Sequence, residues 1–331
     1  MRTRIPLCVT AVLFAAVASG QQVIYLKHVE SAPSLQEMAN AIKTAGDVRD
    51  VSIDPVKKTV TVNGTAEQIA LAQWVCGELD KPSAVQAFAK SQYAAPTSTQ
   101  LAVQVFYLAH SQSSQALQES VNATRAVTDI QRLFPYNPIS AVVASGTVDQ
   151  LAVSEWLLNE LDAPAAQIQT PVLHDHAVQV DPRWGNRAQV FFLPRAHSPQ
   201  AVQDMANLTR SLVDIQWLFP AISRNALVLR GTAEQVAFAD WILTLLNDPT
   251  APAADSAALE YSVQGDTRQG NLARIFFLSH PQDGQELANT IRSTTKMHRV
   301  WYSPFRNALA VRGTGDQIAQ AEQIIRERDR E

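Results

Sequence analysis

The chain has 331 residues, a formal net charge of −4 and 46% apolar residues. This composition is that of a globular protein with two or more domains, and the mildly acidic balance without a basic block argues against nucleic-acid binding. No apolar run reaches the roughly 20 residues that a membrane-spanning helix needs.

The first 20 residues have the pattern of a secretory signal peptide. Arg2 and Arg4 precede an apolar run over residues 5–17, and Ala18-Ser19-Gly20 forms a small-x-small cleavage site. We expect cleavage near Gly20 and a mature chain that is periplasmic or secreted. Cys76 would then be the one remaining cysteine, which excludes an internal disulfide.

One unit recurs four times along the rest of the chain. Its tag is Gly-Thr-x-[Asp/Glu]-Gln, at residues 64–68, 146–150, 231–235 and 313–317, with spacings of 82, 85 and 82 residues. A fixed period of this kind indicates repeated structural modules. The predicted modules cover residues 21–82, 101–164, 188–249 and 272–331. Linkers rich in Ala, Pro, Ser and Gln cover residues 83–100, 165–187 and 250–271, and each is long enough to contain a stray strand.

The predicted elements follow the same order in every unit. An apolar strand opens it, at residues 23–26, 105–108, 190–193 and 275–278. A helix follows, for which Ser34 and Ser198 are predicted N-caps. Two strands joined by a Pro- or Asn-bearing turn come next, and the tag begins a second helix. The sequence therefore predicts an α+β fold of four tandem βαββα modules, each a small mixed three-stranded sheet packed by two helices.

The tag has the composition of a capping box. Its Thr can accept from the free amides of the first helical turn, and its Gln, three residues later, can reach back to the Thr amide. The acidic residue between them suits the positive end of the helix. A phosphate-binding loop would need Gly-Lys-[Ser/Thr], which the tags lack.

The residues around the last two tags resemble the short N-terminal domain of bacterial type II and type III secretion secretins. The resemblance rests on an aromatic-rich first strand, a helix, and Asn-Ala-Leu leading into the tag, and it is best at residues 225–235 and 307–317. It implies a KH-like βαββα module that stacks into periplasmic rings and contacts substrates or inner-membrane partners. The β-rich pore domain of secretins has no counterpart here, so no pore is expected. The Gly-x-x-Gly loop of RNA-binding KH domains is also missing.

A second apolar stripe runs along the tag helix in three units. It lies about 120 degrees from the core stripe, at roughly 100 degrees per residue. Its residues are Leu71 and Trp74, Val153 and Trp156, and Phe238 and Trp241. The fourth unit has Gln320 and Gln323 instead. Two accounts stay open: the following linker or module covers each Trp, as expected for an array with a polar terminal unit, or the stripe binds a partner protein.

Histidines provide the remaining candidates for chemistry. His28, His110 and His280 follow the first strand of three units, where a turn or capping role is expected. His174 and His176, with Asp175 and Asp181, form the best metal candidate, although the spacing fixes no third ligand and a loop role is the simpler interpretation. We find no hydrolase, zinc-protease or dinucleotide motif, and predict neither catalytic residues nor a cofactor.

Together these features predict an exported repeat protein that binds or scaffolds proteins of the cell envelope, as an accessory of a secretion or pilus assembly. The alternative is a metal-binding protein or metal-dependent enzyme that uses His174 and His176. Self-association is a further possibility, and no nucleic acid or membrane span is expected in the mature chain.

Overall fold

The structure is a computed structural model that describes residues 19–82, 87–93, 102–164, 173–177, 185–196, 198–248, 250, 259–264, 268, 270–280 and 284–328. For residues 19 and 173–177 it describes the backbone alone. The predicted signal region before residue 19 lies outside this set. The first strand, β1, begins at Ser19, beside the predicted cleavage site.

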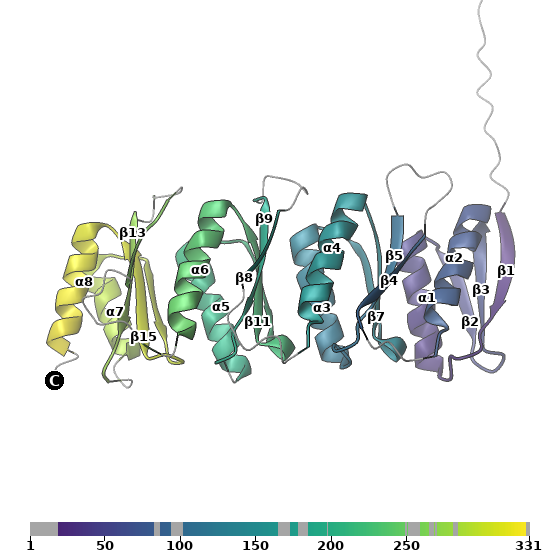
Figure 1. Cartoon of the computed structure of the whole chain (residues 1–331), viewed down its shortest axis with the longest axis horizontal. Coiled ribbons are helices and arrows are strands. Elements are labelled where there is room, and N and C mark those ends of the chain that lie inside the picture. Colours follow the sequence, from purple (N-terminus) through teal and green to yellow (C-terminus); the bar gives the residue numbers. More distant parts are fainter. Residues whose placement is uncertain are drawn as a thin grey trace, which may run out of the picture.

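Four units follow one another in a row, each with the order strand, helix, strand, strand, helix (Figure 1). Module one contains β1 (Ser19–Tyr25), α1 (Ala32–Gly46), β2 (Asp50–Asp54), β3 (Thr59–Thr65) and α2 (Ala66–Leu79). Module two contains β5 (Ala102–Tyr107), α3 (Ser114–Thr128), β6 (Arg132–Tyr136), β7 (Ala141–Gly146) and α4 (Val148–Leu161). Module three contains β9 (Arg187–Phe192), α5 (Pro199–Val213), β10 (Trp217–Ala221), β11 (Ala226–Gly231) and α6 (Ala233–Asn247). Module four contains β13 (Leu272–Phe277), α7 (Gly284–Thr295), β14 (Arg299–Ser303), β15 (Ala308–Gly313) and α8 (Gly315–Arg328).

All four sheets are antiparallel, so the prediction of a mixed sheet was wrong. The strand orders are β1-β3-β2, β4-β5-β7-β6, β8-β9-β11-β10 and β12-β13-β15-β14, where β4 (Ala89–Tyr93), β8 (Leu173–Ala177) and β12 (Glu260–Ser262) precede modules two, three and four. The last strand of each unit lies between the other two and runs opposite to both. The first and second strands are therefore parallel to each other but do not pair, which is why the sheet is not mixed.

Three sheets have four strands, where three were predicted. The additional strands are β4 (Ala89–Tyr93), β8 (Leu173–Ala177) and β12 (Glu260–Ser262), all within the predicted linkers. Each pairs antiparallel with the first strand of the module that follows. The open edge of that sheet supplies the backbone partners that a lone strand lacks.

The tag caps the second helix of every module as predicted. In α2 the Thr65 side chain accepts from the Gln68 amide, and the Gln68 side chain accepts from the Thr65 amide. The same pair of bonds begins α4, α6 and α8. Gln68 also donates to the Asp47 carbonyl at the end of α1, 3.1 Å away. The other three tag glutamines likewise donate to a carbonyl at the end of the first helix of their module, that of Thr128, Asp214 or Thr295. The tag thus ties the start of the second helix to the end of the first.

The first helices of modules one, two and three begin with a serine cap. Ser198 caps α5 with Pro199 at the first helical position, as predicted. In module one the cap is Ser31 and not Ser34, because the Ser31 side chain accepts from the Ser34 amide and the helix begins at Ala32. The capping residue lies one turn earlier than the sequence pattern indicated.

The modules stack in layers along the long axis of the molecule (Figure 1). The two helices of each module cover one face of its sheet. The opposite side of these helices packs on the sheet of the next module, on the face that the next module's own helices leave uncovered. Within the part of the chain that the structure describes, no helix has the length and apolar character needed to cross a membrane.

Candidate interaction surfaces

The three junctions between successive modules are buried and apolar. Contacts join α1 to β6, α3 to β10 and α5 to β14. Side chains alternate along β5: Val105 and Tyr107 pack with the core of module one, whereas Phe106 and Leu108 belong to the core of module two. A strand that is buried on both faces holds the two modules at a fixed position relative to each other.

The structure places the second apolar stripe of α2 beside module two. Leu71 and Trp74 are half-buried and pack against a hydrophobic cluster that includes Val103 and Val105. The Trp74 ring lies 5.4 Å from the Tyr93 ring of β4, measured between centroids. Tyr93 lies in a predicted linker, so sequence reasoning did not identify it as the partner.

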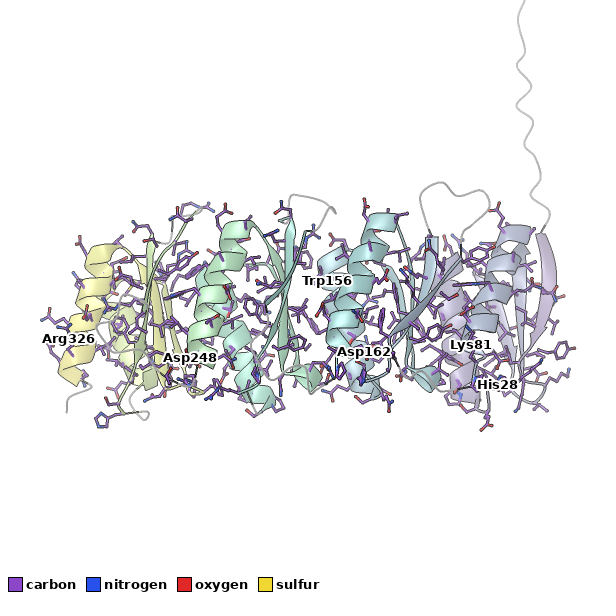
Figure 2. The ribbon with its side chains drawn as sticks, viewed as in Figure 1. His28, Lys81, Trp156, Asp162, Asp248 and Arg326 are labelled. Atoms are coloured by element: carbon purple, nitrogen blue, oxygen red, sulfur yellow. The ribbon has the colours of Figure 1, made fainter. Side chains whose placement is uncertain are left out.

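The two later tag helices have equivalent contacts. Phe238 is buried, and its ring stacks on Tyr261 of β12 with centroids 4.9 Å apart, while Trp241 lies 5.3 Å from the same ring. In α4, Val153 is buried. Trp156 packs against a hydrophobic cluster that joins the helices of module two to the sheet of module three (Figure 2). Trp74, Phe238 and Trp241 therefore contact the linker strand that follows them. Leu71, Val153 and Trp156 pack in or against clusters that include residues of the following sheet.

A polar contact also joins the two modules at the first junction. The Tyr107 hydroxyl donates to the Glu78 carboxylate, and the Lys81 ammonium lies 2.5 Å from the same carboxylate. Burial raises the pKa of Tyr107 well above its ordinary value, and the Glu78 carboxylate adds to this. Burial alone would raise the pKa of Glu78, but hydrogen bonds from Lys81 and Tyr107 outweigh it and lower that pKa. Tyr107 therefore stays neutral and Glu78 stays charged.

Arginines from each sheet meet the end of the first helix of the preceding module. These helices end at Asp47, Asp129 and Asp214, all in the left-handed conformation. Arg132 lies 3.1 Å from the Asp47 carboxylate, and Arg299 forms an ion pair with Asp214. A cation suits this position because unsatisfied carbonyls give the helix end a partial negative charge.

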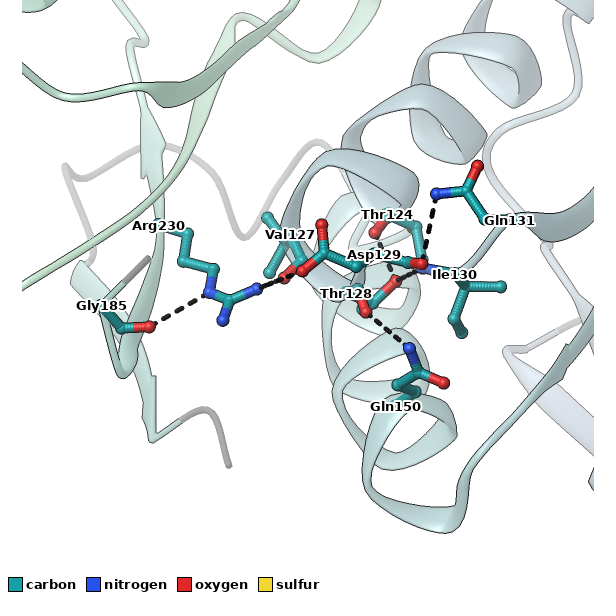
Figure 3. Close-up of polar contacts among 9 residues, drawn as sticks. All are labelled: Thr124, Val127, Thr128, Asp129, Ile130, Gln131, Gln150, Gly185 and Arg230. Carbon is teal, nitrogen blue, oxygen red and sulfur yellow. Dashed lines mark hydrogen bonds and ion pairs between the residues drawn. The ribbon is translucent and has the colours of Figure 1, made fainter. Parts of the chain in front are cut away.

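Arg230 is the most deeply buried of these arginines, with 1% of its surface exposed. Its guanidinium donates to the Val127 carbonyl at 2.8 Å, to the Asp129 carboxylate at 3.2 Å and to the Gly185 carbonyl at 3.1 Å (Figure 3). Arg312 makes equivalent bonds to Leu212 and Gly270 in the next junction. Sequence reasoning missed both residues, although an arginine at one position in two otherwise apolar strands was an available signal.

Two aspartates hold the loop that contains His28 or His110. Asp80 and Asp162 end the second helices of modules one and two, and each carboxylate accepts three consecutive backbone amides. The donors are Lys27, His28 and Val29 in module one, and Ala109, His110 and Ser111 in module two. His28 Nδ1 is also 2.8 Å from the Asp80 carbonyl. These histidines therefore lie in loops that an aspartate stabilises.

The proposed metal residues lie partly outside the described part of the chain. His174 and His176 belong to β8, where their backbones pair with Val190 and Ala188, so the prediction of a loop at this point was wrong. Their side chains and Asp181 are among the residues that the structure does not describe. Within the described residues, no group of three or more His, Cys, Asp or Glu is placed to hold a metal ion.

No protein-family model matches the chain, and no curated protein matches it. Seven chains of solved structures do match it. Aeromonas hydrophila ExeD shares 16% identity, over 70% of this chain and 41% of that chain, with a TM-score of 0.17. A chain of the ETEC pilotin–secretin AspS–GspD complex shares 14% identity, over 70% of this chain and 38% of that chain, also with a TM-score of 0.17. The chain is similar to bacterial secretins.

The chain spans about two fifths of the length of these two chains.

Proposed function

We propose that this chain is exported to the bacterial periplasm and acts there as a scaffold, a rod of four modules that holds protein partners as an accessory of a secretion or pilus assembly. The observation that carries the proposal is the burial of side chains at all three junctions. Arg230 and Val105, which lie in two different junctions, have 1% and 0% of their surface exposed. Flexible linkage of independent domains would leave such residues in water.

The junctions support this role because they fix the spacing between modules. Linked domains with small, polar contacts move relative to one another, whereas a large apolar interface restrains them. Here apolar clusters extend from the helices of one module into the sheet of the next. A partner with repeated binding sites would meet a row of surfaces at fixed distances, and avidity would strengthen its binding.

We infer that Leu71, Trp74, Val153, Trp156, Phe238 and Trp241 serve the junctions and do not form a separate surface for a partner. Their contacts with the following sheet and edge strand support this inference. The partner surface must then lie along the sides of the rod.

The sides of the rod offer strand edges. Among the described strands, β2, β6, β10 and β14 each lie at one edge of their sheet. An edge strand presents backbone donors and acceptors that can pair with an extended segment of another protein. We therefore propose that partners add along these edges.

Site-specific photo-crosslinking in the bacterium that encodes the chain tests this proposal. A photoreactive residue at Gln131 or Gln216 would lie at equivalent exposed positions directly before β6 and β10. A matched control at Val148, which is 69% exposed, lies at the start of α4, a helix that packs on β5 and β7. We expect one and the same envelope protein to be captured from Gln131 and Gln216 and not from Val148. Equal capture from all three positions, or from none, would contradict the proposal.

A further inference from the structure

The two ends of the rod present the same positions that the internal junctions use. The outward face of the β1-β3-β2 sheet corresponds to the junction faces of the other three sheets, and we call it the head face. The outward side of α7 and α8 corresponds to the junction sides of the earlier helices, and we call it the tail face (Figure 1). Equivalent residues in the helices and in the last two strands follow from the tag positions at Gly64, Gly146, Gly231 and Gly313, and those in the first strands follow from their pairing with the last strand of the module.

The two residues of the Tyr–Glu contact in the first junction have equivalents at opposite ends of the rod. Tyr107 of β5 corresponds to Tyr25 on the head face, and Glu78 of α2 corresponds to Glu327 on the tail face. Tyr107 is 6% exposed and bonded to Glu78, whereas Tyr25 is 74% exposed. Glu327 is also exposed. The head face therefore has the donor, and the tail face the acceptor, of a contact that the chain already makes internally.

The Arg–Asp contact is also represented, but with its charges exchanged. Arg132 and Arg299 occupy the sheet position that Asp50 holds on the head face. Asp47, Asp129 and Asp214 occupy the left-handed helix end that Lys296 holds on the tail face, where Lys296 has a φ of 59°. The head face therefore has an anion where the internal sheets have a cation. The tail face has a cation where the internal helix ends have an anion. An ion pair between Asp50 and Lys296 would therefore replace those between Arg132 and Asp47 and between Arg299 and Asp214.

A reduced apolar contact remains at the same faces. Val23 is 38% exposed, whereas its counterparts Val105, Val190 and Ile275 are fully buried in the junctions. On the tail face Ile324 is half-buried, whereas its counterparts Val75, Leu157 and Ile242 are fully buried. Gln320 and Gln323 replace the large apolar pair of the other tag helices. The two ends are thus more polar than the internal junctions, and Val23 and Ile324 remain available for a small apolar contact.

We propose that the head face of one copy docks on the tail face of a second copy, so that rods associate end to end through Tyr25 with Glu327 and Asp50 with Lys296. Charge complementarity and continuity with the internal junctions identify the occupant as a second copy of this chain. The exchanged charges also disfavour docking of either end on an internal junction face, because like charges would then meet. Asp50 would face Asp47, Asp129 or Asp214. Lys296 would face Arg132 or Arg299. This association concerns the ends and is independent of any partner along the sides.

We expect this end-to-end contact to be weak, because its ion pair is exposed and most of its surface is polar. We expect association that rises with protein concentration and falls as salt screens the charges. Sedimentation velocity on the mature chain, over a series of concentrations at low and at high salt, measures this. A chain that remains a monomer at every concentration in low salt would overturn the proposal, and the polar ends would then act only as caps.

Charge-reversal variants test whether Asp50 and Lys296 form this contact. Asp50→Lys and Lys296→Asp should each weaken association by roughly three- to ten-fold, in keeping with the small energies of exposed ion pairs. The chain with both substitutions should regain association, and an equimolar mixture of the two single variants should form heterodimers. Lys57→Glu reverses another exposed charge of module one and serves as the matched control. Association that persists in both single variants, or that the double variant does not restore, would show that other faces are responsible.

Discussion

Arg230 in the central strand of module three donates a 2.8 Å hydrogen bond to the Val127 carbonyl at the end of the first helix of module two. The two residues are 103 positions apart in the sequence. Such a bond can form only when the two modules are docked, so it couples the stability of one module to that of its neighbour.

Arg230→Ala should destabilise the chain by about 2–4 kcal/mol. The substitution leaves the Val127 carbonyl without this donor and opens a cavity in a buried junction. The value lies below the usual cost of breaking a fully buried pair because Asp129 remains one third exposed and water can solvate it. Denaturant unfolding followed by Trp fluorescence measures the loss. Arg326→Ala, at the exposed end of α8 (Figure 2), is the control and should stay within about 0.5 kcal/mol of the parent.

Trp74→Ala should cost about 3–5 kcal/mol, the usual range for removing a large buried side chain, with the lower end favoured because Trp74 is half-buried. The substitution removes the contact with Tyr93 and weakens the first junction. Gln323→Ala changes the equivalent position of α8, which is exposed, and should be near neutral. Calorimetry of the two variants gives the comparison. An unchanged free energy of unfolding for Trp74→Ala would discard the packing account and favour the partner-binding account.

Gly185→Ala should destabilise module three strongly. Gly185 has a φ of +91°, and a Cβ there would lie 2.0 Å from the Gly231 carbonyl carbon. The backbone would have to move, which would also displace the Gly185 carbonyl from Arg230. We expect a loss of several kcal/mol, seen as a lower melting temperature. Gly77→Ala is the matched control, since a Cβ at this position in α2 meets nothing within 4 Å. That change should stabilise by up to about 1 kcal/mol through helix propensity.

The stability of the chain should fall at alkaline pH partly because of Cys76. Burial raises the pKa of this thiol to about 12, with a smaller contribution from Asp80. In the unfolded chain the thiol ionises near its ordinary pKa of about 8.5. Its favourable effect on folding is thus fully present below about pH 8.5 and is lost as the pH rises towards 12, at about 1.4 kcal/mol per pH unit. Unfolding free energies of the parent and of Cys76→Ala, measured as a function of pH, should differ in slope by one proton. Equal slopes would contradict this assignment.

The sequence by itself determined the features that are formed by residues close together along the chain. The period of the tags set the number of units, hydrophobic patterning gave the order βαββα, and the Thr65–Gln68 capping box follows from two residues three positions apart. These features form within one module, because their donors and acceptors lie close together along the chain. The resemblance to secretin N-terminal domains has the same local basis.

Only the tertiary structure decided what joins the modules. Pairing of the linker strands β4, β8 and β12 depends on the edge of another sheet, and the position of Tyr93 over Trp74 follows from that pairing. Whether Arg230 is an exposed cation or a buried donor depends on a helix end 103 residues away. Sequence periodicity shows that a face is apolar, but it does not show which surface covers that face, because contacts between modules are set by the docking of whole layers.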